Sequence, residues 1–96
     1  MYARVASFEG GDDARLRQLN EERSGAGTLG LPEGLSRALM LSDQEGNRRL
    51  FITFFDTREQ IAAAEARFES MGDEIPDEIR GRRTSVDVYE VTFEGP

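Results

Sequence analysis

The sequence predicts an α+β domain in which two helices accompany a four-stranded antiparallel sheet, in the order strand, helix, strand, strand, helix, strand. Four segments rich in β-branched and aromatic residues are bounded by stretches rich in glycine or charge, as strands are. Two segments with apolar residues at helical spacing lie between them. The chain has 96 residues, which suits a single domain over residues 1–96 with a thin hydrophobic core.

The first third of the chain predicts a strand, a short helix and a long loop. Residues 2–9 mix Tyr, Val and Phe with small residues and end at a Gly-Gly pair, which favours a strand. Two aspartates follow and are good N-caps for a short helix through Leu16 and Leu19. Residues 24–34 hold four glycines and a proline, so we expect a long loop there, which could serve as a lid.

The middle of the chain predicts an antiparallel hairpin. Residues 35–42 alternate in the manner of a strand, residues 43–47 form a turn, and residues 48–55 return as the next strand. The second of these strands carries large apolar side chains at both parities, with Leu50, Ile52 and Phe54 on one face and Phe51 and Phe55 on the other. Both faces of the sheet are therefore expected to be apolar.

The last third predicts a capped helix and a final strand. Asp56 and Thr57 each stand three residues before a Glu or Gln, the spacing of a capping box. The helix then shows an apolar stripe at steps of three and four, and Gly72 is expected to end it in the left-handed conformation. Residues 73–83 are expected to form a loop or one irregular turn. Residues 84–93 predict a strand whose apolar parity switches between Val88 and Tyr89, which a bulge there would explain.

This order of elements is the split βαβ pattern of a ferredoxin-like fold. Two helices cover only one face of a four-stranded sheet, so the second apolar face would be larger than a monomer usually exposes. We therefore expect a second copy to pack sheet to sheet about a two-fold axis, which gives a dimeric α+β barrel. The alternative is a curled monomer whose long loop folds over that face.

The composition excludes several kinds of chemistry. The chain has no Cys, His, Trp or Lys, so all 12 basic residues are arginines, against 19 Asp or Glu, for a net charge of −7. Disulfides, thiol nucleophiles, a Ser-His triad and the usual ligands of zinc, copper and haem are missing, so neither a metal site nor a cofactor is predicted. No apolar run approaches the length of a membrane helix and no signal peptide is evident, so we expect a cytoplasmic protein with no membrane partner.

Two short motifs resemble binding sites but lack the required context. Residues 25–30 match the dinucleotide fingerprint GxGxxG, yet they follow a helix and run into a Leu-Pro pair instead of opening a helix. Arg80, Arg82 and Arg83 form a basic cluster, but acidic residues at 73, 74, 77 and 78 precede it and should neutralise it. Because the whole chain is also acidic, no nucleic acid is expected as a partner. The acidic residues lack the ligand spacing of a calcium loop.

Several short stretches together carry a family resemblance over nearly the whole chain. They are Met1-Tyr2-Ala3-Arg4-Val5, residues 34–41, residues 43–46, Phe55-Asp56-Thr57 and Val88-Tyr89-Glu90-Val91. In this order, they resemble the dimeric α+β barrel superfamily, in particular the antibiotic biosynthesis monooxygenase-like proteins. Members often carry Trp where this chain has Phe55. This chain therefore keeps an aromatic side chain at that position but lacks the indole. The haem-degrading branch uses Asn, Trp and His, and the lack of Trp and His excludes it.

The resemblance implies a homodimer with a small pocket between the helices and the sheet of each subunit. In some members, such a pocket supports oxidation of aromatic or quinol substrates by oxygen without a metal or flavin. A substrate that itself gives electrons to oxygen needs only to be desolvated and oriented. The expected function is therefore that of a homodimer that binds a small aromatic molecule. The alternative is a non-catalytic structural or regulatory binding module.

Five polar residues are the candidates for contact with such a ligand: Ser7, Asn20, Arg37, Thr53 and Tyr89. The choice supposes that the first strand points Ala3, Val5 and Ser7 toward the helices. The alternative for each candidate is an ordinary structural role, as a strand-end hydroxyl, a helix-surface amide or a packed Tyr with its hydroxyl in water. No residue is assigned a catalytic role.

Overall fold

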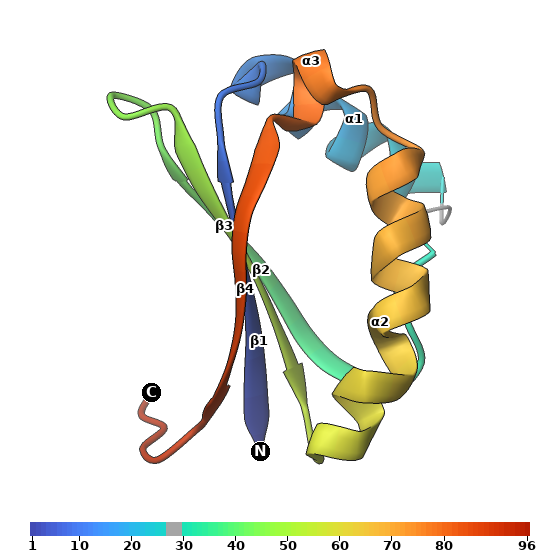
Figure 1. Ribbon diagram of the computed structural model, residues 1–96, viewed down its shortest axis with the longest axis vertical. Coiled ribbons are helices and arrows are strands. Elements are labelled where there is room, and N and C mark those ends of the chain that lie inside the picture. The colour runs from blue at the N-terminus through green and yellow to red at the C-terminus, as the bar shows by residue number, and fades with distance from the viewer. Residues whose placement is uncertain (27–29) are drawn as a thin grey trace.

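The computed structural model describes residues 1–26 and 30–96. The elements in this part of the chain are β1 (Tyr2–Glu9), α1 (Asp13–Ala26), β2 (Leu35–Asp43), β3 (Arg48–Phe55), α2 (Arg58–Asp73), α3 (Asp77–Arg80) and β4 (Arg82–Glu90). The strands form one sheet, and the helices lie together on one side of it (Figure 1). The predicted α+β order is therefore confirmed, with α3 as a short additional helix where an irregular turn was expected.

The sheet has the strand order β2-β3-β1-β4, and each neighbouring pair is antiparallel. β1 therefore lies in the interior of the sheet, with Val5 opposite Ile52 of β3 and opposite Asp87 of β4. This is the split βαβ arrangement of a ferredoxin-like fold. The predicted hairpin of β2 and β3 is confirmed.

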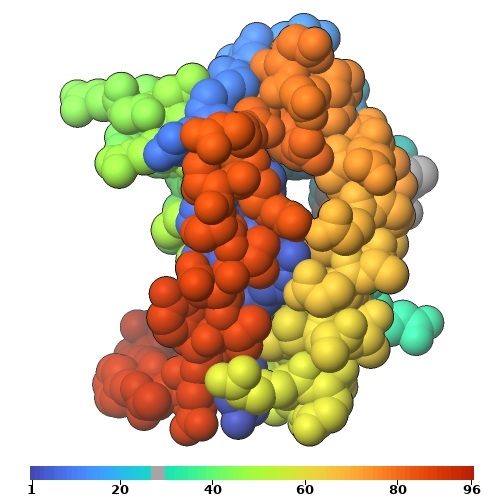
Figure 2. Space-filling view, viewed as in Figure 1, coloured from blue at the N-terminus to red at the C-terminus, as the bar shows by residue number. Residues whose placement is uncertain are grey.

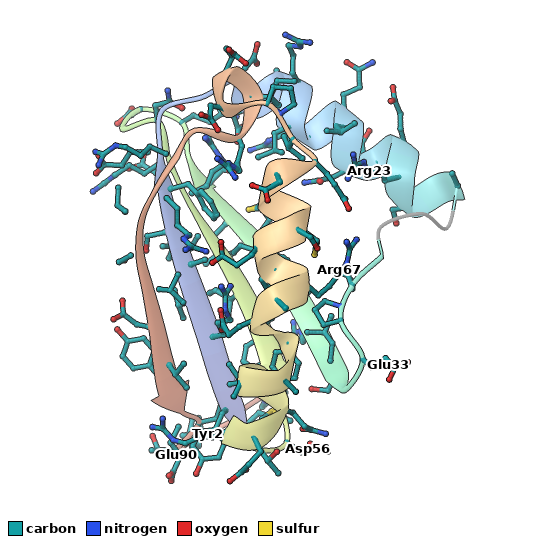
Figure 3. All side chains as sticks on the ribbon, turned by 45° about the vertical axis from the view of Figure 1, so that its right-hand side comes forward. Tyr2, Arg23, Glu33, Asp56, Arg67 and Glu90 are labelled. Carbon is teal, nitrogen blue, oxygen red and sulfur yellow. The ribbon has the colours of Figure 1, made fainter. Side chains whose placement is uncertain are left out.

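The segment predicted as a long loop is partly helical. α1 continues to Ala26, residues 27–29 lie outside the described residues, and the backbone at Gly30 is irregular. The GxGxxG motif and the expected lid thus fall partly outside the described residues. Arg67 of α2 points toward the segment that leads into β2 (Figure 3), and its Nε donates a hydrogen bond to the Gly30 carbonyl at 2.6 Å. This contact ties the start of that segment to α2.

The orientation expected for β1 is wrong. Arg4 reaches α2, where its guanidinium contacts Glu65 and the ring of Phe68. Residues of the same parity as Arg4 therefore face the helices, while Ala3, Val5 and Ser7 lie on the opposite, outer face of the sheet. The expectation placed Ala3, Val5 and Ser7 inward, but α2 supplies a carboxylate and an aromatic ring that make an inward arginine stable.

The predicted bulge in the last strand is also misplaced. Ser7 pairs with Ser85 while Phe8 pairs with Arg83, so Thr84 is the extra residue on β4. Val86 and Val88 face the helices, and Tyr89 faces outward opposite Ala3. The parity switch in the sequence needs no bulge, because this strand carries apolar residues on both faces.

The start of α2 follows the prediction, and its end does not. The Thr57 hydroxyl accepts a hydrogen bond from the Gln60 backbone N–H at 3.2 Å, and the Gln60 side chain accepts one from the Thr57 N–H at 3.1 Å, which completes the capping box. Gly72 stays helical, and α2 ends at Asp73 with Glu74 as its C-cap. A Cβ on Gly72 would stand 2.6 Å from Nη1 of Arg80, the movable end of a long side chain.

The hydrophobic core lies between α2 and the middle of the sheet. The fully buried Phe55 packs against Ile61, Ala64 and Phe68 of α2. The Phe68 ring makes edge-on contacts with Phe55 and Phe51 at centroid distances of 6.3 and 6.2 Å. Such contacts add specificity to the burial of apolar area, so α2 is held firmly against β3.

In residues 1–26 and 30–96, no helix lies on the outer face of the sheet (Figure 1). Leu50, Ile52 and Phe54 share this face, with Leu41 of β2 opposite Leu50 and with Tyr89 of β4 opposite Ala3. Leu41 is 47%, Leu50 37% and Tyr89 56% exposed, so large apolar side chains on this face meet water in a single chain. Within the described residues, no helix is long and apolar enough to cross a membrane.

Candidate functional site

A pocket of about 560 Å³ lies between the helices and the inner face of the sheet. Residues from β1, β2 and β3 form its floor, α1 and α2 its walls, and the connection from α2 into β4 part of its rim. Figure 2 shows an opening into the molecule between β4 and α2. The core around Phe55 and Phe68 fills one end of the helix–sheet interface. The pocket occupies the part of this interface that α2 does not fill.

The wall of the pocket is mostly apolar. Its large apolar side chains include Phe8, Leu16, Met40, Phe51, Phe68 and Met71. Met40 is still 39% exposed on this side, although it lies within the sheet. A concave, largely apolar space with a few polar groups is the usual form of a small-molecule site.

Arg4 lies in the floor of the pocket and is almost fully buried, with 1% of its surface exposed. Its Nε and Nη2 donate to the two carboxylate oxygens of Glu65 at 2.8 and 3.2 Å. The guanidinium carbon stands 4.0 Å from the centroid of the Phe68 ring. The buried charge is thereby both paired and stacked on an aromatic face, the conditions under which an arginine is stable inside a protein.

Arg49 is the second buried arginine of the wall and is 2% exposed. Its Nη2 donates to the carbonyls of Gly10 and Arg80, and its Nη1 lies 3.6 Å from a carboxylate oxygen of Asp13. Its Nε has no hydrogen-bond partner among the described residues. Arg49 therefore joins the turn after β1 to the turn before β4 and closes one end of the pocket.

Asp13 at the start of α1 stays ionised beside Arg49. Burial raises its pKa, but hydrogen bonds from Ser42 and Arg17 and the positive charges of Arg17 and Arg49 act in the other direction and outweigh it. The pKa of Asp13 is therefore below its ordinary value. A carboxylate in the first turn is also favoured by the helix dipole.

Two further arginines reach the rim of the pocket. Arg83 of β4 donates from Nη2 to Glu69 of α2 at 3.0 Å, so this ion pair joins the two elements that border the opening. Arg80 bonds to Asp77 within α3. The side chains of Arg83 and Glu69 are 38% and 62% exposed, so water reaches both partners of the rim pair.

The pocket includes one of the five candidates predicted from the sequence. Asn20 of α1 lines it. Thr53 faces the helices opposite Arg4, is completely buried, and its hydroxyl oxygen has no hydrogen-bond partner in the described part of the chain. Whether either residue touches a ligand stays a prediction.

The other three candidates lie on the outer face. Ser7 pairs with Ser85 and borders a second groove there, and Arg37 and Tyr89 are exposed on the same side. The expectation that they reach the helix–sheet pocket is wrong, because it depended on the opposite orientation of β1. Asp87 and Glu90, the carboxylates within the last strand, are exposed as well.

Two buried arginines of the wall, Arg4 and Arg49, were missed as site residues in the sequence. Arg4 stands inside an otherwise apolar strand segment, and Arg49 follows Arg48 at the start of one, both at the parity that also carries Phe51 and Phe55. That pattern was available in the sequence, since a charged residue on a core-facing parity must find a partner. Which carboxylates serve as partners depends on the packing of the helices.

Comparisons with known proteins bear on the fold. No family model matches the chain, and no curated protein matches its sequence. The solved structure of Rv0793 from Mycobacterium tuberculosis matches with a TM-score of 0.62 at 13% identity, over 99% of this chain and 98% of that one. A Deinococcus radiodurans structure titled a "putative antibiotic biosynthesis monooxygenase" matches with a TM-score of 0.50 at 14% identity, over 100% of this chain and 97% of that one. These two likenesses show that the fold is shared with known proteins over nearly the whole chain.

Proposed function

We propose that this chain binds a small, largely apolar molecule in the pocket between its helices and its sheet. The observation that carries this proposal is the pocket of about 560 Å³, which falls within the range of about 300 to 1,000 Å³ typical of ligand sites. A helix–sheet space filled by Leu16, Leu19, Ile61 and Phe68 would have left no such volume. Ile61 and Phe68 fill only one end, and Leu16 instead lines the open part.

We further propose that the bound molecule is an aromatic or quinol substrate that is oxidised by oxygen without a cofactor. One solved structure of similar fold carries a monooxygenase name, which supports this choice. In the oxidation of an anthrone to an anthraquinone, one atom of O₂ enters the ring as a carbonyl oxygen and the other leaves as water, and the substrate supplies the electrons. The protein's contribution would be to exclude water and to orient the ring.

Oxygen consumption tests this proposal directly. Purified protein is given a panel of anthrols and quinols in an oxygen electrode, and products are identified by mass spectrometry. Ala38→Phe places a ring in the pocket, whereas Ala66→Phe places the same ring on the exposed side of α2 and serves as control. We expect uptake with at least one substrate, lost in Ala38→Phe and kept in Ala66→Phe. Uptake that persists in Ala38→Phe would contradict the assignment to this pocket.

A second candidate function is that of a non-catalytic binding module. It is favoured by the pairing of the charged groups in the pocket wall, where Arg4, Arg49, Arg80 and Arg83 each contact a carboxylate. Acid–base catalysis needs a group that can take up or release a proton at the reacting atom. Binding of the aromatic panel without any oxygen uptake would favour this function.

We also propose that the chain forms a homodimer through the outer face of the sheet. The proposal is supported by the exposure of Leu41, Leu50 and Tyr89 on that face, which no other element covers in the described part of the chain. A stable interface buries about 800 Å² on each partner, which one face of a four-stranded sheet can provide. Sedimentation at micromolar concentration measures the state directly, and a stable monomer would contradict the proposal.

A further inference from the structure

The arginines of the pocket wall differ in how far their donors are already used. Arg4 is bound twice by Glu65, and Arg49 is held by two backbone carbonyls and by Asp13; both are almost fully buried. The Nε and Nη2 atoms of Arg80 bond to Gly81 and Asp77, and its Nη1 packs close to Gly72. In the described part of the chain, Arg83 makes a single hydrogen bond, to Glu69.

We propose that Arg83 is the anion-binding residue of the pocket, and that its ligand is an apolar carboxylic acid. The inference rests on the proposed function, that this pocket binds a small molecule, and it names the chemical class of that molecule. The ligand's carboxylate takes the place of the Glu69 carboxylate on Arg83, while its apolar body lies against the pocket wall.

The exchange at Arg83 is favoured by the position of the ion pair. Arg83 and Glu69 are 38% and 62% exposed, and ion pairs with this access to water contribute little to stability. Glu69 can therefore return to water at small cost. A guanidinium presents five N–H donors in a planar fork that fits a carboxylate with two parallel bonds, and Glu69 uses only one of them.

The neighbours of Arg83 fit the rest of such a ligand. Phe8 stands directly opposite Arg83 in the pairing of β1 and β4, and both residues line the pocket. The apolar body would therefore begin beside Phe8 and extend toward Phe51 and Met40. The chain as a whole carries a charge of −7 and therefore repels anions. A carboxylate binds favourably to this protein only next to a cationic side chain.

The adjacent residue provides a matched control. Arg82 is 77% exposed, lies beside Glu9 at 3.6 Å and is outside the pocket lining. Arg82→Met and Arg83→Met remove the same charge from neighbouring positions on the surface of β4. A difference between them therefore reports contact with the ligand, because the change in net charge is identical.

The test compares two probes of equal shape, 2-naphthoate and 2-naphthylmethanol, by equilibrium dialysis with naphthalene fluorescence at low ionic strength. We expect the wild type to bind the acid about tenfold or more tightly than the alcohol, as a charge-assisted hydrogen bond would give. Arg83→Met should bind the two within about twofold of each other, and Arg82→Met should keep the preference. Glu69→Gln removes the competing negative charge beside Arg83 and should tighten naphthoate binding about threefold or more without changing binding of the alcohol.

The Glu69→Gln arm separates a ligand contact from a structural role. Both Glu69→Gln and Arg83→Met break the same ion pair, so a purely structural pair predicts the same change for both variants, whereas a ligand contact predicts opposite changes. Equal binding of acid and alcohol by the wild type, or a similar loss in Arg82→Met and Arg83→Met, would overturn the inference and leave the small-molecule function standing. If neither probe binds the wild type, the proposed pocket function fails and the inference fails with it.

Discussion

Arg4 shows how a single residue can decide the orientation of a strand. It stands in an interior strand, at a position where Val or Ile would be ordinary, and its charge is accommodated by Glu65 on one side and by the Phe68 ring on another. Removing one partner of a buried pair is costly, because the other charge stays buried without compensation. The two members of this pair should therefore differ in how they tolerate substitution.

We expect Glu65→Ala to lower the free energy of unfolding by about 2 kcal/mol or more, less than the roughly 3 to 5 of a wholly buried pair because water reaches Glu65. Arg4→Met removes the charge but keeps much of the volume over Phe68, so it should cost less, about 1 kcal/mol. Urea unfolding followed by circular dichroism measures both, with Glu94→Ala in the exposed C-terminal segment as control. A larger loss in Arg4→Met than in Glu65→Ala would show that packing, and not charge compensation, dominates at this position.

Among the elements, the turn after β1 and the turn before β4 support each other. Gly10 and Gly81 both have positive φ angles, of 79° and 82°. A Cβ on Gly81 would stand 2.6 Å from the Gly10 carbonyl oxygen and 2.7 Å from that of Glu9, whereas a Cβ on Gly10 would meet nothing within 4 Å. Both glycines have a positive φ, and only Gly81 also has a packing requirement.

Replacing Gly10 or Gly81 by alanine tests how closely the turn after β1 packs against the turn before β4. Gly10→Ala should cost about 1 kcal/mol, because an L-residue is strained at positive φ. Gly81→Ala adds a clash with fixed backbone atoms and should cost about 3 kcal/mol or more. Urea unfolding of the two variants under the same conditions gives the difference. Equal losses would mean that the two turns move apart freely and do not fix the rim of the pocket.

At the scale of the whole molecule, the two faces of the sheet have separate roles. The inner face forms the core at one end and the pocket at the other, and both depend on where α2 lies. The outer face has no helix and exposes Leu41 beside Leu50 across neighbouring strands. Because these leucines already face water in one chain, charges placed there should affect assembly more than folding.

The double variant Leu41→Glu with Leu50→Glu tests the assembly. We expect the wild type to sediment as a dimer at micromolar concentration and the variant as a monomer with unchanged circular dichroism, since a dry interface would have to bury four carboxylates. Ala62→Glu with Ala63→Glu adds the same charge to the exposed side of α2 and should remain a dimer. A variant that still dimerises would place the interface elsewhere.

Local patterns predicted the order of the elements well. The Thr57 capping box starts α2, and apolar residues at both parities of residues 48–55 indicate a sheet with two apolar faces. Each of these signals lies within a few residues, so the sequence alone carries it. The orientation of β1 was predicted wrongly, because Glu65, the carboxylate that pairs with an inward Arg4, lies 61 residues away, on α2.

The sequence by itself determined the fold class, the apolar second face and the exclusion of thiol, disulfide and histidine chemistry, since these follow from composition and short periodicities. Only the tertiary structure decided which side of the sheet forms the pocket, and with it that Asn20 lines the pocket while Ser7, Arg37 and Tyr89 lie outside. It also decided that Arg83 meets Glu69 at the rim. The physical reason is that an arginine is stable inside a protein only where distant segments bring a carboxylate to it, and the spacing of residues along one strand does not contain that contact.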